Sequence, residues 1–136
     1  MCGAYGLSIK KAKEVYDRFG VQNTLADLSA RYNIRLGQLN PVITREKEVS
    51  ISRMIWGLIP HSAKDEHYRY RTINAKAETV AQLPSFRTSL KSKRCLVPAT
   101  GFYEPDKIRF TKPPYPWHYY HLRSDDIFAF AGIYDI

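Results

Sequence analysis

The residue with the most distinctive chemistry in this sequence is Cys2, which stands directly behind the initiator methionine in the opening stretch MCGAYG. Removal of Met1 would leave a cysteine whose thiol and free α-amine sit on adjacent carbons. An α-amine has an ordinary pKa of about 7.7 to 8.0, so a substantial fraction is neutral at physiological pH and can form a Schiff base with an aldehyde. The thiolate can then close a thiazolidine ring on the same carbon. Cys2 is therefore a candidate aldehyde trap, whereas a retained Met1 would lock its amine in a peptide bond.

The other residues with reactive or metal-binding side chains do not form a second candidate site. Cys95 lies inside the apolar run RCLVPA, so we expect it to be a buried core residue. Two cysteines are too few for a disulfide framework. His118 and His121 are three residues apart, which on a strand places them on opposite faces. We therefore predict no metal and no cofactor.

Composition limits the class of protein and of partner. The chain has 136 residues, with 21 Lys and Arg against 13 Asp and Glu and a net charge of +8. This excess fits a negatively charged partner, most simply a nucleic acid backbone, although a merely solvated basic surface fits the charge alone equally well. No run approaches the roughly 20 apolar residues of a membrane span, and no signal peptide is recognisable. We expect a single domain, residues 1–136, that works inside the cell and away from membranes.

Helical periodicity is confined to the first part of the chain. The spacing of apolar residues predicts an amphipathic helix over 8–20, with Ser8 as its N-cap and Gly20 as its C-terminal stop. A shorter helical turn is predicted within NTLADLSARY (23–32), where Leu25 and Leu28 would share a face.

Beyond that point, β-branched and aromatic runs bounded by Pro and Gly predict strands. They are EVSISRMIWGLIP (48–60), RCLVPATGFYE (94–104), PYPWHYYHL (114–122) and DIFAFAGIYDI (126–136). Strands and helices in this order predict an α+β domain, with a largely antiparallel, barrel-like β-sheet and a few flanking helices.

Several short segments, taken in order, carry a resemblance to a known family. They are MCG at the start, RYNI (31–34), WGLIP (56–60), NAKAET (74–79), RCLVPATGFYE (94–104) and FAFAGIYD (128–135). Their order and spacing resemble the SOS-response-associated peptidase (SRAP) family over the whole chain. The resemblance implies a protein that shields abasic sites in single-stranded DNA by a thiazolidine crosslink between Cys2 and the ring-opened sugar aldehyde.

The resemblance also implies roles for individual residues. Cys2 matches the family's nucleophile, Asn74 its active-site asparagine and Glu104 its acid/base carboxylate. A carboxylate can move the protons of Schiff-base formation, and an asparagine can orient the amine or the sugar while staying uncharged. Without the resemblance, Asn74 would be predicted to be a turn residue and Glu104 a solvated charge.

DNA contacts are expected from polar and basic residues close to the matching motifs, because phosphate contacts give affinity that is independent of sequence and sensitive to salt. The predicted DNA-binding residues are Asn33, Arg35, Lys76 and Arg87, with Arg31, Lys91, Lys93 and Arg94 as further cations nearby. The aromatic side chains of Tyr32, Phe102 and Tyr103 offer stacking surfaces for unpaired bases, although we expect each of them to be buried in the core.

The sequence departs from the family pattern at positions that would touch DNA. Ala4, Leu36, Ser62 and Pro105 stand where the family more often has Arg, Pro, Trp and Trp, and Lys76 stands where it more often has Arg. Side chains that would wedge or stack on DNA are thus replaced. This predicts weaker binding or a different path for the DNA.

Length is the larger departure, because family members usually continue for several strands into a segment with a histidine that assists the Schiff-base chemistry. This chain ends in a strong strand pattern, so we expect it to be the N-terminal portion of the family's usual length and weakened in that chemistry.

Two other functions stay open: a thiol peptidase, acting on other peptides or only on its own Met1–Cys2 bond, and a non-covalent single-stranded DNA module. We expect a monomer and, in a prokaryote, a cytoplasmic location near the nucleoid.

Overall fold

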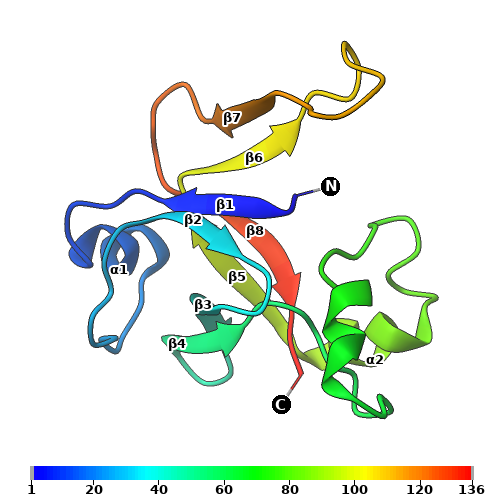
Figure 1. Cartoon of the computed structure of the whole chain (residues 1–136). Coiled ribbons are helices and arrows are strands. Elements are labelled where there is room, and N and C mark those ends of the chain that lie inside the picture. Colours follow the sequence, from blue (N-terminus) through cyan, green and yellow to red (C-terminus); the bar gives the residue numbers. More distant parts are fainter. Residues whose placement is uncertain (1, 136) are drawn as a thin grey trace.

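A computed structural model of the chain describes residues 2–135, which form eight strands, two α-helices and one 3-10 helix (Figure 1). In chain order these elements are β1 (Ala4–Leu7), α1 (Lys13–Phe19), β2 (Arg31–Arg35), β3 (Leu39–Arg45), β4 (Val49–Ile55), η1 (Glu66–Arg71), α2 (Pro84–Ser92), β5 (Arg94–Ala99), β6 (Gly101–Pro105), β7 (Trp117–His121) and β8 (Phe128–Ile133). None of the helices in this range is long and apolar enough to cross a membrane.

The strands form two four-stranded sheets, with the orders β2-β1-β6-β7 and β4-β3-β5-β8. Every neighbouring pair is antiparallel. The predicted α+β class with largely antiparallel pairing is therefore confirmed. A closed barrel is not formed, because within residues 2–135 no ladder joins the edge strands of one sheet to those of the other.

The chain passes from one sheet to the other at Thr100, the single residue between β5 and β6. Its backbone N–H donates to the carbonyl of Gly6 at 2.8 Å, and its hydroxyl accepts from the N–H of Ser8 at 2.8 Å. This corner fastens β1 to the connection between β5 and β6. Figure 1 shows β1 lying beside β6 at this junction.

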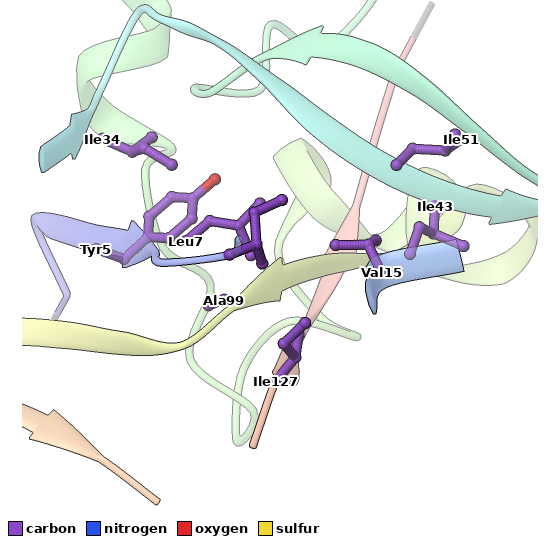
Figure 2. Close-up of a cluster of buried hydrophobic side chains, with 9 residues drawn as sticks. Tyr5, Leu7, Val15, Ile34, Ile43, Ile51, Ala99 and Ile127 are labelled. Carbon is purple, nitrogen blue, oxygen red and sulfur yellow. The ribbon is translucent and has the colours of Figure 1, made fainter. Parts of the chain in front are cut away.

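The hydrophobic core lies between the two sheets and under α1. Leu7, Val15, Ile34, Ile51 and Ala99 are all buried, and Figure 2 shows their side chains converging from α1 and four strands. Each fully buried Leu, Ile or Val side chain stabilises the fold by about 1.5–3 kcal/mol. All four positions of β1 are buried, so the strand that follows the N-terminus belongs to the core.

The helix predicted over 8–20 ends where expected but begins later. Gly20 caps α1 in the left-handed conformation, with a φ of 64°, as predicted. The helix starts only at Lys13, and Ser8 is not its N-cap because its N–H is bound at the Thr100 corner. Glu14 supplies the N-terminal contacts instead, since its carboxylate accepts from two backbone N–H groups before the helix at 2.8 Å.

The helical turn predicted within 23–32 is wrong. This segment contains a turn at 26–27 and then the start of β2, and Asp27 in the turn has a φ of 56°, a left-handed conformation that interrupts a right-handed helix. Before the turn, Asn23 ties the segment to β4. Its side-chain amide donates to the carbonyl of Ile51 at 2.9 Å and accepts from the N–H of the same residue at 2.8 Å.

The four predicted strand segments are confirmed. They contain β4, the pair β5 and β6, β7, and β8. The helix α2 was not predicted; Pro84 stands at its first turn, where a missing N–H costs nothing, and Phe86 is its buried apolar side chain.

Candidate active site around Cys2

Cys2 is positioned by the strand that follows it. Ala4 is the register partner of Arg35 on β2 and of Tyr103 on β6, so β1 is held on both sides. The Cys2 side chain is half-buried against the hydrophobic core. Its Sγ donates to the carbonyl of Ala4 at 3.3 Å, which keeps the thiol folded back toward β1.

The surroundings of Cys2 favour its neutral thiol. Burial raises the pKa of the Cys2 thiol above its ordinary value, and the charge of Glu104 raises it further, whereas the contact with the Ala4 backbone acts in the opposite direction. The thiol is therefore protonated at neutral pH, and its use as a nucleophile requires a base.

Asn74 reaches Cys2 from a distant loop. Its Nδ2 donates to the backbone carbonyl of Cys2 at 2.8 Å. Two hydrogen bonds, made by the preceding residues Ile73 and Thr72, hold this loop in place. Trp56 Nε1 donates to the carbonyl of Ile73 at 2.9 Å, and the buried Thr72 hydroxyl donates to the carbonyl of Leu58. The backbone that precedes Asn74 is thus fixed by hydrogen bonds to residues 56–58.

Glu104 approaches the same residue from β6. It follows Tyr103, the register partner of Ala4, and lies opposite His118 on β7. Its side chain is half-buried, and its charge acts on the Cys2 thiol. The structure therefore brings the predicted residues Cys2, Asn74 and Glu104 together from three separate segments.

A cavity of about 980 Å³ opens beside Cys2 and Asn74. Tyr5, Trp56 and Phe130 line it, and the ring of Tyr5 packs edge-on against the other two at centroid distances of 5.6 and 5.8 Å. The Tyr5 hydroxyl is buried, and it finds no hydrogen-bond partner among the described residues. Burial raises the pKa of this hydroxyl well above its ordinary range, so it is a neutral phenol.

The predicted DNA-binding residues are exposed. Lys76 lies two residues beyond Asn74, and Arg87 lies on α2. Asn33 and Arg35 are on β2, where the Asn33 side-chain oxygen accepts from Arg35 Nε at 2.8 Å. They come from three segments: β2, which pairs with β1, the loop that carries Asn74, and α2.

Two further cations named from the sequence have internal partners. The Arg31 guanidinium donates to the carbonyl of Leu39 at 2.6 Å and to Asn40 Oδ1 at 2.9 Å. Lys93 forms an ion pair with Asp135. Both side chains hold segments of the fold together.

The burial expected for the aromatic residues is wrong for Tyr32, which is 64% exposed on β2. Phe102 and Tyr103 are half-buried.

Cys95 is buried as predicted, and burial raises the pKa of its thiol to about 11. Sequence reasoning did not single out Trp56 as part of the site, although its motif WGLIP was recognised.

The two histidines considered for a metal site contact different carboxylates. His118 Nε2 lies 3.2 Å from Asp106 Oδ2, and His121 Nδ1 lies 2.7 Å from Asp125 Oδ1. Among residues 2–135, no group of three or more His, Cys, Asp or Glu side chains is arranged to hold a metal ion.

Comparison with known proteins gives a consistent result along the chain. The family model described as SOS response associated peptidase (SRAP) matches residues 1–136. The abasic site processing protein YobE of Bacillus subtilis is 37% identical over 138 residues, which cover 99% of this chain and 62% of YobE. The abasic site processing protein HMCES of Xenopus tropicalis is 32% identical over 79 residues, 55% of this chain and 24% of HMCES.

A solved structure supports the same relationship. A protein from Bacteroides thetaiotaomicron matches with a TM-score of 0.80 and 32% identity, over 97% of this chain and 59% of that one. A phage-related protein from Bordetella bronchiseptica matches with a TM-score of 0.70 and 28% identity, over 97% of this chain and 60% of that one. The chain thus spans about three fifths of the length of the relatives that it matches almost end to end.

Proposed function

The chain belongs to the SOS response associated peptidase (SRAP) family, and from this premise we propose that it recognises abasic sites in single-stranded DNA and bonds to them through Cys2. The observation that carries the proposal is the 2.8 Å hydrogen bond from Asn74 to the carbonyl of Cys2. Chain termini are usually poorly ordered unless they are tied down. A side chain that reaches the second residue from a distant loop is what an amino-terminal nucleophile needs.

The proposed reaction joins the aminothiol of Cys2 to the aldehyde of a ring-opened abasic sugar, after Met1 has been removed. The neutral α-amine attacks the aldehyde carbon, forming a C–N bond, and loss of one water gives the imine. The thiol then adds across the C=N bond: a C–S bond forms, and the thiol proton ends on the nitrogen. The product is a thiazolidine, and the balance is one water released with no change of oxidation state.

Glu104 and Asn74 have separate roles in this proposal. Because the Cys2 thiol is protonated at neutral pH, ring closure needs a group that accepts its proton, and the carboxylate whose charge acts on that thiol is Glu104. The same carboxyl group can deliver a proton to the departing hydroxyl. Asn74 holds the Cys2 carbonyl and thereby limits the orientations of the amine and thiol on the adjacent carbon.

Binding of the DNA strand rests on charge in this proposal. The chain carries a net charge of +8, and Arg35, Lys76 and Arg87 are exposed. Such cations hold phosphates without regard to sequence. We further propose that the protein acts as a monomer and, in a prokaryote, in the cytoplasm close to the nucleoid.

Intact-protein mass spectrometry tests the proposal. Met1-free protein is incubated with a single-stranded oligonucleotide that carries one abasic site. We expect an adduct with the mass of protein plus oligonucleotide less one water. Cys2→Ala should form no adduct, and Cys95→Ala, which leaves the amino terminus intact, should form it normally. Borohydride reduction of the abasic aldehyde to an alcohol should abolish the adduct but leave binding.

The same samples separate the alternatives. Salt-sensitive binding of folded, Met1-free protein with no adduct would reject the covalent proposal and leave a non-covalent DNA-binding module. Hydrolysis of an unrelated peptide that disappears in Cys2→Ala would establish a thiol peptidase instead.

A further inference from the structure

The sheet β2-β1-β6-β7 has an outer face on which aromatic rings lie flat. Tyr119 is the clearest case: a Cβ added at Gly101 would come within 2.2 Å of its ring, and one added at Gly6 would lie 3.5 Å from its hydroxyl. The ring therefore covers backbone where the neighbouring strands have no side chain. Its other side faces outward, and Tyr119 is 41% exposed.

Further rings extend this surface along β6 and β7. Tyr103, the register partner of Tyr119, has its ring centroid 4.8 Å away, and His121 stacks on Tyr119 at 5.8 Å with an interplanar angle of 21°. The Tyr103 hydroxyl donates to the carbonyl of Tyr32 at 3.0 Å, so the side chain reaches β2 across β1.

Trp117 and Arg35 complete the surface at the end nearest Cys2. The Arg35 guanidinium lies 5.9 Å from the centroid of the Trp117 ring, and Trp117 is 54% exposed. Trp117 is the register partner of Pro105, the residue that follows Glu104. We call Arg35, Tyr103, Trp117, Tyr119 and His121 the aromatic platform; its Trp117 end adjoins Pro105, whereas Glu104 lies on the other face of the same strand.

Strand alternation keeps the platform separate from the hydrophobic interior. Residues two apart on a strand, and residues directly opposite each other, share a face of the sheet. Phe102 and Tyr120 therefore lie on the other face, where they stack at 5.4 Å, and Phe102 contacts Phe130 of the second sheet. The platform residues are not required to fill that interior.

We propose that the aromatic platform binds unpaired bases of the DNA strand that flanks the Cys2 site. Stacked rings with open faces fit planar π-systems, and exposed aromatic residues on a four-stranded sheet bind the bases of single-stranded nucleic acids in this way. Charge supports a nucleic acid strand over a basic or neutral protein surface: Arg35 lies within the platform, and the loop joining β6 to β7 carries Lys107, Arg109 and Lys112.

The identity of the strand as abasic DNA rests on the proposed function, whereas base stacking on the platform does not require the covalent step. The abasic residue itself has no base to stack, so contacts with neighbouring bases would contribute affinity that the damaged position cannot. Trp117 in particular places a large ring opposite Pro105, which has no aromatic side chain of its own.

The test measures equilibrium binding of a short single-stranded oligonucleotide that contains no abasic site, so that no crosslink can form. Fluorescence anisotropy should show that Trp117→Leu binds about tenfold more weakly than the unsubstituted chain, in line with the loss of one stacked base. Tyr120→Leu is the matched control: its side chain is 50% exposed on the same strand but faces away from the platform, and it should bind normally.

A chemical substitution on the DNA provides a second arm that needs no protein variant. An oligonucleotide whose bases are replaced by tetrahydrofuran spacers should bind the unsubstituted chain about tenfold more weakly than the normal strand. Trp117→Leu should discriminate less between the two strands, because the contact has already been removed. Equal affinity of the unsubstituted chain for both strands would overturn the proposal.

The outcomes also separate this inference from the proposed function. If the unsubstituted chain crosslinks abasic DNA but Trp117→Leu binds as tightly as it does, the platform proposal fails alone. If platform binding is found but no adduct forms, the covalent proposal fails alone. If Trp117→Leu changes sedimentation from dimer to monomer with unchanged DNA affinity, the platform is an interface between two copies and the proposal is wrong.

Discussion

Asn74 donates a hydrogen bond of 2.8 Å to the backbone carbonyl of Cys2, which lies 72 residues earlier in the chain. This contact and the pairing of β1 hold the second residue from two directions. Cys2 is therefore a positioned residue, and the chemistry proposed for it depends on residues that the fold brings from elsewhere.

Asn74→Asp should slow crosslinking by about 10- to 100-fold while leaving the fold intact. The aspartate keeps the size of the side chain but has no N–H to donate, and its charge repels the Cys2 carbonyl. Small misplacements of a reacting group have effects of this size. Single-turnover crosslinking with abasic DNA measures the rate, and Gln22→Glu is the control, because this exposed amide donates to the carbonyl of Gly20 instead. Unchanged crosslinking in Asn74→Asp would show that the contact has no part in the chemistry.

Glu104→Gln should change two properties of Cys2 in opposite directions. The Glu104 charge raises the pKa of the Cys2 thiol, so removing that charge lowers the pKa and speeds alkylation by iodoacetamide at a fixed pH below it. Crosslinking should instead slow by about 10²- to 10⁴-fold, because the proton carrier is lost. Glu46→Gln, in the exposed β3–β4 turn, should alter neither rate. Parallel slowing of both reactions in Glu104→Gln would indicate disturbed folding rather than lost proton transfer.

Tyr5→Phe should raise the free energy of unfolding. The Tyr5 hydroxyl is buried without a hydrogen-bond partner among the described residues, and a buried unsatisfied polar group costs about 1–3 kcal/mol. The ring contacts with Trp56 and Phe130 are kept. Tyr16→Phe should have the opposite effect, because the Tyr16 hydroxyl accepts from the N–H of Leu25 at 2.9 Å. Urea unfolding of both variants decides the question, and a loss of stability in Tyr5→Phe would mean that its hydroxyl is satisfied in solution.

Cys95 should make the fold less stable in alkali. Burial raises the pKa of its thiol from 9.0 to about 11, so its neutral form is favoured in the folded chain. The contribution of the neutral Cys95 thiol to the free energy of unfolding is fully present below pH 9.0 and is lost as pH rises toward 11. Cys95→Ala should be less stable at neutral pH because of the cavity, but its unfolding free energy should fall less steeply over this interval. Identical slopes in the two proteins would contradict the assignment.

The strands were predictable where side chains alone determine them. The runs around Cys95, Trp117 and Phe128 are β-branched or aromatic and are bounded by Pro or Gly, and all became strands. β1 was not predictable in this way, because the four residues AYGL owe their pairing to β2 and β6. The helix start was misjudged for a related reason: Ser8 bonds to Thr100, a contact between residues 92 apart.

The site could be predicted only as far as motifs describe it. Asn74 and Glu104 were identified through the family resemblance, since nothing local distinguishes an asparagine in a loop or a glutamate on a strand. The roles of Tyr5 and Trp117 depend on register and packing. The pairing of Trp117 with Pro105 determines which face of the sheet carries the Trp117 side chain. Neither segment's own sequence predicts that pairing.

The central place of β1 also fixes an order of events during synthesis. β1 pairs with β2 and with β6, which ends at Pro105, so its neighbourhood cannot be completed until about a hundred further residues have been made. At about 5–20 residues per second, that interval is roughly 5 to 20 seconds. Throughout it β1 lacks its β6 neighbour, and the nascent amino terminus is open to the enzymes that trim methionine. Maturation of the amino terminus can therefore precede assembly of the pocket beside Cys2.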